Sequence, residues 1–292
     1  GISQKLSSAS KSFAPFSAAA TAAGVAGVKT FANFESQMSK VGAITGDVAS
    51  SDLPAIVKAA NEMGLAFEDG ANATETAMNI LEAKAKQMGA QTKFSATESG
   101  QAMEYMAMAG WKTADMLNGI EGIMSLAAAS GEDLATTSDI VTDALTAFGM
   151  SAADSSHFSD VLAQASANAN TNVSLLGESF KYVAPVAGAM KYSVEDVSIA
   201  LGLMANSSIK GSMAGTALKT AIANMASPTK KMAAAMNKYG ISLTETDGSM
   251  KSFKGVIDNL RSSLGNLSET EQTAAATAIF GKEAMAGMLA II

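Results

Sequence analysis

The stretch that most constrains the fold is residues 188–226, because it combines a helix start, a short loop and two glycines in helical spacing. Ser193 can act as an N-cap, and Asp196 three residues later completes a pattern typical of a capping box. Apolar residues then recur at steps of three and four, which predicts one buried helix face: Val194, Val197, Leu201 and Met204. The polar run 206–208 interrupts this pattern. We therefore predict two helices joined by a short loop.

The second of these helices is predicted to carry a seam of small and apolar residues: Gly211, Gly215, Leu218, Ile222 and Met225. A glycine costs a helix about 1 kcal/mol relative to alanine, so close approach of another backbone is the expected compensation. That backbone belongs either to a partner, such as another copy of the chain, or to a helix of the same chain. We favour the contact within the chain.

The composition favours helices over sheets. The chain of 292 residues is 48% hydrophobic, but only 5% of its residues are aromatic, whereas 19 are methionine. Small side chains and methionine suit helices that pack closely together, and β-sandwiches use β-branched and aromatic residues instead. The predicted fold class is all-α, with many short helices arranged in antiparallel hairpins.

Charge and cysteine content exclude several kinds of site. The formal net charge is −7 and the Lys and Arg residues are scattered, which argues against binding of nucleic acid or anionic lipid. The chain contains no cysteine. Disulfides, thiolate metal sites and cysteine nucleophiles are therefore excluded.

Several helix ends can be predicted elsewhere in the chain. Ser95 and Glu98 form a capping box that begins a helix, and Gly89 is the expected end of the helix before it. Ser227 and Pro228 are predicted to begin another helix as N-cap and first residue. Residues 241–252 are the one β candidate, a small hairpin with Asp247-Gly248 at its turn.

The chain divides by composition into a lead-in and a core. Residues 1–30 are rich in Ala and Gly, and we interpret them as a helix that leads into the core, in preference to a signal peptide or a membrane span. Residues 31–292 form the predicted helical core. A faint similarity at an offset of about 77 to 80 residues indicates a duplicated unit. The predicted subdivisions of the core are residues 91–168, 169–226 and 227–292.

The sequence lacks the patterns that usually indicate catalysis. His157 is the only histidine, and it lies in a polar stretch without a nucleophile motif beside it. Asp139 and Asp143 lie one helical turn apart and could share a cation, but a solvated helix face is the simpler interpretation. No phosphate-binding loop is present. We expect no enzymatic activity, no metal and no cofactor.

Four segments, in this order along the chain, carry a resemblance to a known family. They are the run Phe34–Val41, residues 126–149 with their Leu-Ala-Ala-Ala-Ser and Asp-Ile-Val-Thr-Asp sequences, residues 197–219, and Ile279-Phe-Gly281. Together they resemble the core region of phage tail tape-measure proteins over roughly residues 30–290. In that resemblance the signature residues, which we expect to serve helix packing, are Gly211, Gly215, Thr216, Leu218, Lys219 and Ile222.

The resemblance implies a structural role in a virion. Such a protein would fill the tail tube during assembly, set the tail length and leave before DNA passes. Its implied partners are further copies of itself, the proteins of the tail tube and tail tip, tail assembly chaperones and a host inner-membrane protein or the membrane itself. The alternative function is a membrane-active or pore-forming helical module, which the Ala-, Gly- and Met-rich helices motivate. From its glycine start and apolar end we also expect the chain to be part of a longer one.

Overall fold

The computed structural model describes residues 18–67 and 72–292, with side chains described from residue 30 onward, so most of the predicted lead-in, residues 1–17, lies outside it. The described part is helical, and its α-helices are, in chain order, α2 (Ala18–Thr45), α3 (Leu53–Glu62), α4 (Ala73–Gln91), α5 (Ala96–Met108), α6 (Thr113–Ser130), α7 (Leu134–Phe148), α8 (Ser155–Asn168), α9 (Val173–Ala189), α10 (Val194–Asn206), α11 (Ser212–Ala226), α12 (Lys230–Lys238), α13 (Phe253–Leu264), α14 (Glu269–Phe280) and α15 (Lys282–Ile291). One 3-10 turn, η1 (Ala152–Asp154), precedes α8. The all-α prediction is therefore confirmed.

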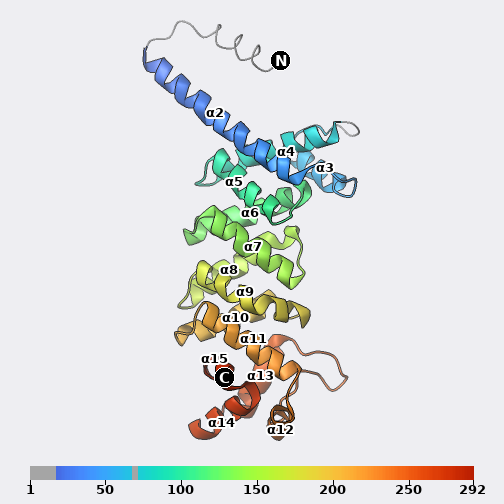
Figure 1. The fold of residues 1–292 in the computed structure, drawn as a ribbon, viewed down its shortest axis with the longest axis vertical. Coiled ribbons are helices and arrows are strands. Elements are labelled where there is room, and N and C mark those ends of the chain that lie inside the picture. Colours follow the sequence, from blue (N-terminus) through green and yellow to red (C-terminus); the bar gives the residue numbers. More distant parts are fainter. Residues whose placement is uncertain (1–17, 68–71) are drawn as a thin grey trace.

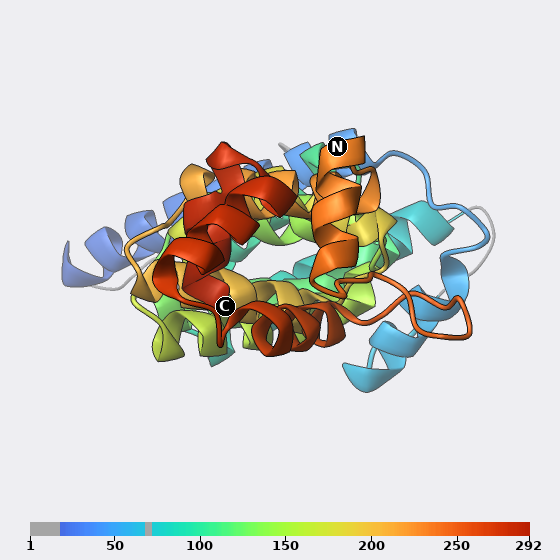
Figure 2. The ribbon, with the colours of Figure 1, turned by 90° about the horizontal axis from the view of Figure 1, so that it is seen from below.

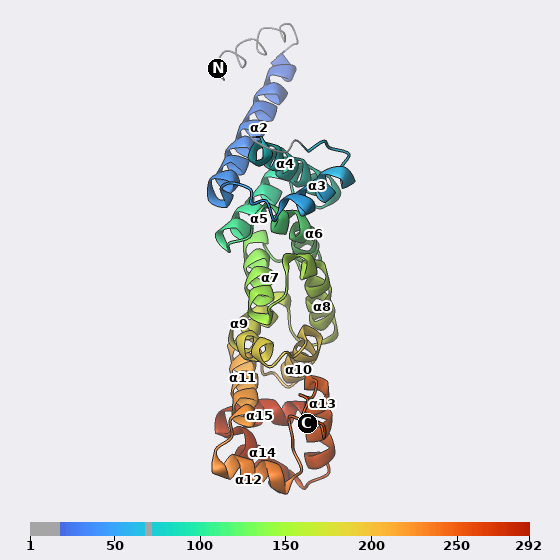
Figure 3. The ribbon, with the colours of Figure 1, turned by 90° about the vertical axis from the view of Figure 1, so that its right-hand side faces the viewer.

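The middle helices stack in two columns along the long axis of the molecule (Figure 1 and Figure 3). We call α5, α7, α9 and α11 column A, and α6, α8 and α10 column B. From α5 to α9, each helix packs more extensively against the helix two positions further along the chain than against the next helix. The expected antiparallel hairpins of successive helices are therefore wrong as a description of the packing. The stack is a solenoid, in which each helix pair lies on the next.

The helices of column A recur at a nearly constant interval along the chain. Their first residues are Ala96, Leu134, Val173 and Ser212, and the steps between these positions differ by no more than one. The faint similarity found in the sequence spans two such intervals. The division into units 91–168 and 169–226 stays a prediction, and the predicted boundary between residues 30 and 31 falls inside α2.

The core lies where the two columns meet, and it contains few but well-placed aromatic rings. The Phe180 ring on α9 lies 5.7 Å from that of Phe148 at the end of α7 and 5.7 Å from that of Phe158 on α8. Phe158 and Phe180 are almost fully buried. Methionine and alanine fill most of the remaining space between helices, as the composition predicts.

The lower end of the stack is covered by α12 to α15 (Figure 2). The Tyr192 ring, in the turn before α10, lies 4.8 Å from the Phe253 ring at the start of α13, so the C-terminal helices are attached to the columns through an aromatic contact. Burial raises the pKa of Tyr192 to about 12. At the upper end α2 packs across α5, where Gln37 donates hydrogen bonds to the Gly100 carbonyl (3.3 Å) and to Glu104 (2.5 Å).

The predicted hairpin at residues 241–252 is wrong. The segment is a loop with one isolated antiparallel bridge between Thr244 and Met250. Its backbone hydrogen bonds between the two arms are Lys251 N–H to the Leu243 carbonyl (2.8 Å) and Glu245 N–H to the Ser249 carbonyl (2.8 Å). A two-stranded ribbon is marginally stable, and so short a pairing leaves a turn without strands.

Two predicted helix ends are also wrong, for identifiable reasons. Helix α4 continues through Gly89, where a Cβ would lie 2.5 Å from the Ala96 nitrogen, so this glycine permits the close approach of α5. Helix α12 begins two residues later than predicted, because the Thr229 hydroxyl, not Ser227, accepts the hydrogen bond from the Met232 N–H (3.3 Å).

Candidate functional site

The closest helix contact in the predicted signature segment lies between α9 and α11. Gly215 sits directly on the backbone of Ser179: a Cβ at position 215 would overlap the Ser179 carbonyl oxygen and lie 2.9 Å from its carbon. Both helices belong to this chain, so the backbone that approaches the glycine is supplied within the molecule. Backbone atoms cannot rotate away as a side chain can, which makes this position specific for glycine.

Gly211 takes part in the same contact but not as a helical residue. It precedes α11 with φ +57° and ψ −137°, a conformation that favours glycine, so its predicted place inside the helix is wrong. The Ser179 hydroxyl donates to the Gly211 carbonyl (2.8 Å) and to the Leu175 carbonyl (3.0 Å). One buried serine of α9 is therefore in contact with both glycines of the predicted seam.

The other signature residues divide between the core and the surface. Leu218 and Ile222 are fully buried on the face of α11 that packs into the molecule. Thr216 is half-buried and Lys219 is exposed, so these two side chains lie toward solvent. Only part of the signature therefore has a packing role within this chain.

The same use of glycine occurs at the contacts above and below, which the sequence reasoning missed. A Cβ on Gly188 of α9 would overlap the Ala147 carbonyl oxygen of α7, and one on Gly177 would overlap the Ile140 side chain. Below, a Cβ on Gly287 of α15 would lie 2.9 Å from that of Ala217 on α11. These glycines do not share a regular spacing in the sequence, so no pattern identified them.

The predicted caps occupy the first turns of α5 and α10. The Ser95 N–H donates to a Glu98 carboxylate oxygen (2.7 Å), and the Glu98 N–H donates to the Ser95 hydroxyl (3.2 Å). The hydrogen bonds from the Ser95 backbone and hydroxyl lower the pKa of Glu98. The Ser193 hydroxyl accepts from the Asp196 N–H (3.2 Å), but the Asp196 carboxylate accepts from the Lys254 N–H (2.8 Å) at the start of α13. Asp196 thus links column B to the C-terminal helices.

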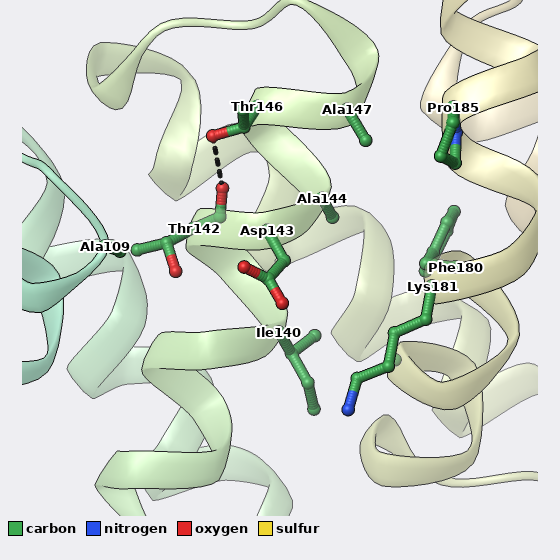
Figure 4. A pocket seen from close by; sticks show the side chains of 11 residues that line it. Ala109, Ile140, Thr142, Asp143, Ala144, Thr146, Ala147, Phe180, Lys181 and Pro185 are labelled. Atoms are coloured by element: carbon green, nitrogen blue, oxygen red, sulfur yellow. Dashed lines mark hydrogen bonds between the residues drawn. The ribbon is translucent and has the colours of Figure 1, made fainter.

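Of the two carboxylates one helical turn apart, Asp143 lines a pocket of about 390 Å³ between α7 and α9, whereas Asp139 is not part of its lining (Figure 4). Figure 4 shows Asp143 on α7 and Lys181 on α9 with Ile140 and Phe180 between the two helices. Burial raises the pKa of Asp139, and the nearby Asp143 carboxylate raises it further, while Lys181 lowers it. Among the residues with described side chains, no three His, Cys, Asp or Glu residues gather as metal ligands would.

The histidine is engaged by a carboxylate at the surface. His157 Nε2 lies 2.6 Å from a Glu195 carboxylate oxygen, which connects the first turns of α8 and α10. Burial raises the pKa of Glu195, but hydrogen bonds from its own backbone, His157 and Ser193, together with the charge of His157, lower it overall. Both side chains are substantially exposed, and an exposed ion pair of this kind contributes little to stability.

No described helix combines the length and the apolar character that crossing a lipid bilayer requires. The side chains that the fold brings together most closely are packing and capping residues on stacked helices. They define a structural module of the helical-repeat class.

The comparisons with known proteins identify the family. The model of the family described as phage-related minor tail protein matches residues 82–281. The chain belongs to this family, and within it to the phage tape-measure proteins, of which it forms one region. The resemblance that the sequence suggested is therefore confirmed.

Two curated relatives show how much of such a protein the chain spans. It is 34% identical over 267 residues to the tape measure protein of Pneumococcus phage Dp-1, covering 91% of this chain and 21% of that protein. It is 24% identical over 209 residues to the probable tape measure protein of Escherichia phage P2, covering 71% of this chain and 26% of that protein. The chain thus spans about a quarter or less of either relative. No solved structure gives a significant match.

Proposed function

We propose that this chain is a folded module of a protein that sets tail length during assembly and occupies the tail tube before genome ejection. Its relatives are tape measure proteins, and a component of the phage tail belongs in the virion. The observation that carries the proposal is the series of glycine contacts in column A, through which short helices pack closely into one body. The module contributes scaffolding in the tail lumen or at its tip.

The length of the tail is set, in this proposal, by other parts of the full protein. A continuous helix advances about 1.5 Å per residue, so a straight helix as long as the segment 173–211 would span about 58 Å. In the stack, the same length of chain instead turns back on itself and advances the molecule by one helix layer (Figure 3). A stacked module therefore spans less length per residue than a straight helix does. In this proposal it anchors or nucleates the tail, and other parts of the protein set the length.

Electron microscopy of tails tests this division of labour. A phage whose tape-measure gene lacks residues 173–211, one layer of the stack, is expected to fail in tail assembly or to make tails of normal length. The matched control removes a segment of equal length from a part of the protein outside this module, and its tails are expected to be shorter by about 58 Å. Normal assembly with the same shortening in both phages would overturn the proposal.

The proposed partners follow from the same role. They are further copies of the chain, tail tube and tail tip proteins and tail assembly chaperones, with a host inner-membrane protein or the membrane at ejection. The second function, a membrane-active module, has one supporting observation, the exposed apolar side chains of Met108, Ile199 and Met213. These lie on three different helices, α5, α10 and α11, which favours the structural role. Liposome leakage caused by the purified chain would favour the membrane-active one.

A further inference from the structure

The positive charge of the chain is concentrated in one segment toward the lower end of the stack. Residues 210–254 contain seven Lys against one Glu and one Asp, whereas the whole chain has 27 acidic and 20 basic residues. This segment runs from the loop before α11 through α12 to the first turn of α13 (Figure 3). A basic segment in an acidic chain indicates a surface that attracts acidic groups.

Two of these lysines lie where the helix itself opposes their charge. Lys230 and Lys231 are the first two residues of α12, and no acidic residue accompanies them in that turn. The N-terminus of a helix carries partial positive charge, so a cation there destabilises the helix. Residues that break a local rule of folding in this way are expected at functional sites.

A groove of about 470 Å³ lies beside this turn, between the end of α11, α12 and the loop 241–250. Its floor is apolar and consists of four buried side chains, those of Met225, Met236, Ile241 and Leu243. Met250, in the loop, also lines it and is 46% exposed. Methionine side chains adapt to the shape of what they contact, so this floor can receive an apolar side chain.

Lysines from two sides border the groove. Lys230 lies three positions before the lining residue Ala233, and therefore on the same face of α12. The Lys251 N–H donates to the carbonyl of the lining residue Leu243 (2.8 Å), which fixes Lys251 beside the floor. The groove thus combines an apolar floor with a basic border.

A third lysine joins the border from the turn before α10. Lys191 follows the lining residue Met190 in the sequence. The Tyr192 ring lies 4.8 Å from the Phe253 ring, so this turn lies next to the segment that contains Lys251. Three segments that are distant in the sequence therefore bring lysines to one place.

These three lysines have no carboxylate partner among the described residues. Ion pairs with Asp or Glu engage five other lysines of the described chain: Lys58, Lys84, Lys86, Lys181 and Lys254. Glu245 and Asp247 lie in the loop itself, but no described lysine pairs with them, and Asp247 accepts a hydrogen bond from the Ser249 hydroxyl (2.6 Å). Unpaired like charges around an apolar floor are complementary to an acidic group that comes from outside.

The lining also indicates which kind of acidic partner fits. Bases of single-stranded nucleic acid stack on aromatic rings, and the described lining contains none. A lipid surface takes up apolar side chains that project from a protein, whereas most of those here form the floor of a hollow. A polypeptide that carries both carboxylates and apolar side chains matches the border and the floor together.

The parts of this chain itself match less well. Residues 1–17, outside the described structure, contain two Lys and no Asp or Glu, so their charge is of the wrong sign. In the acidic helices of the stack, several carboxylates already cap helix starts, among them those of Glu98, Asp133 and Asp154. These observations favour a different polypeptide over a second copy.

We propose that the groove between α11, α12 and the loop 241–250 binds an acidic segment of a partner protein. Apolar side chains of that segment contact Met236 and Met250, and its carboxylates lie beside Lys230 and Lys251. The inference concerns binding by the chain itself and does not depend on whether the module helps to set tail length.

Binding of defined peptides to the 292-residue chain tests the proposal. The probe is a synthetic peptide in which leucines are flanked by glutamates, and its control has glutamines in place of the glutamates. Fluorescence anisotropy is expected to show about tenfold tighter binding of the glutamate peptide at low salt, and a smaller difference at high salt. Methyl NMR is expected to show shifts of the Met236 and Met250 signals and none of the Met108 signal.

Two matched double variants locate the charge. Lys230→Gln with Lys251→Gln is expected to weaken binding of the glutamate peptide about tenfold, to the level of the glutamine peptide. Lys58→Gln with Lys86→Gln removes the same charge from lysines of α3 and α4 that have carboxylate partners, and is expected to leave binding unchanged. Thermal melts verify folding, and Lys230→Gln is expected to keep or raise the stability, because it removes a cation from a helix N-terminus.

A second pair of variants tests the apolar contact. Met250→Ser is expected to weaken binding of both peptides, whereas Met108→Ser, at another exposed position, leaves it unchanged. No binding of either peptide at millimolar concentration, equal binding of both, or binding that Lys230→Gln with Lys251→Gln does not change would overturn the proposal.

Other occupants would be revealed by the same variants. Sedimentation that shows self-association of the chain, abolished by Lys230→Gln with Lys251→Gln, would assign the groove to a second copy and overturn the proposal. Tighter binding of single-stranded DNA or of phosphatidylglycerol vesicles than of the glutamate peptide, lost in the same variant, would also overturn it.

Discussion

The contacts α9–α11 and α8–α10 cross the same step of the stack, yet they are built differently. In the α9–α11 contact, Gly215 lets the two backbones approach closely, and the buried Ser179 hydroxyl donates a hydrogen bond to the Gly211 carbonyl. In the second, a Cβ on Gly202 would lie 3.2 Å from the Cβ of Ala169, and the buried Ser198 hydroxyl has no hydrogen-bond partner among the described residues. The comparison teaches that a glycine on a helix does not by itself indicate a tight seam, since what faces it decides its role.

Exchanging each glycine for alanine gives the largest expected difference. Gly215→Ala forces a Cβ into the Ser179 carbonyl, so we expect a loss of about 3 kcal/mol in the free energy of unfolding, and Gly215→Leu a larger one. Gly202→Ala meets only a methyl group and gains helix propensity of about 1 kcal/mol, so its stability should be unchanged or higher. Urea unfolding followed by circular dichroism measures both. Equal effects would show that the two contacts are alike.

The two serines sharpen the same comparison. Ser179→Ala removes a hydroxyl that donates to two carbonyls, and we expect a loss of about 1 kcal/mol. Ser198→Ala removes a buried hydroxyl that has no hydrogen-bond partner among the described residues, so the stability is expected to stay the same or to rise. Chemical denaturation of the pair, measured side by side, distinguishes these outcomes. A larger loss for Ser198→Ala would mean that its hydroxyl is satisfied in solution.

Acid should destabilise the folded stack, because it protonates carboxylates that accept hydrogen bonds at the N-termini of its helices. Hydrogen bonds from Ser95, Thr136 and Ser151 lower the pKa of Glu98, Asp133 and Asp154 respectively. A carboxylate with a lowered pKa stabilises the folded state above its ordinary pKa, and this contribution is lost as the pH falls through the lowered value. Melting temperature should therefore decline as the pH is taken from 5 to 3, and less steeply in Glu98→Gln. If melting temperature depends on pH equally in Glu98→Gln and in the parent, Glu98 does not contribute to the loss of stability in acid.

Asp139 should behave in the opposite way. Burial and Asp143 raise its pKa, so its ionisation opposes folding as the pH rises. Asp139→Asn is therefore expected to raise the melting temperature slightly at pH 7 and to have no effect at pH 3. Asp143→Asn serves as a comparison, because it removes the repelling charge. A lower melting temperature for Asp139→Asn at pH 7 would contradict this interpretation.

The smallest expected effect concerns Ile199, an exposed side chain of α10. Ile199→Asp changes a side chain that is already largely in water, so we expect less than about 0.5 kcal/mol of change in the free energy of unfolding. Leu218→Ala, on the closed contact, should cost about 2 to 5 kcal/mol because the leucine is fully buried. Thermal unfolding of these variants verifies that the open side of the stack contributes little to its stability.

What could be predicted from the sequence is what depends on nearby residues. The capping box of Ser95 and Glu98 and the N-cap Ser193 need only a few adjacent positions, and the structure contains them. The role of a glycine depends on which distant backbone meets it, so Gly89 was mistaken for a helix end and Gly211 for a helical residue. Gly177 and Gly188 gave no signal at all, because the groups that face them belong to the preceding helix of column A, far away in the sequence.

The candidate sites follow the same rule. The carboxylates at positions 139 and 143 could be found from their helical spacing, whereas the approach of Lys181 from α9 could not. A groove of about 620 Å³ between α8 and α10 was not predicted, since it lies between two helices whose contact residues are 38 positions apart, as His157 and Glu195 are. The hairpin at residues 241–252 was overpredicted, because turn chemistry alone does not supply strands.

The layered connectivity also determines how the molecule would respond to tension. Each layer is held mainly by the layers directly above and below it, so a pull on one terminus loads a single interface at a time. Such a body is expected to come apart in successive small steps and not in one cooperative rupture. A polypeptide built in this way can be drawn out through a narrow passage without any single large barrier.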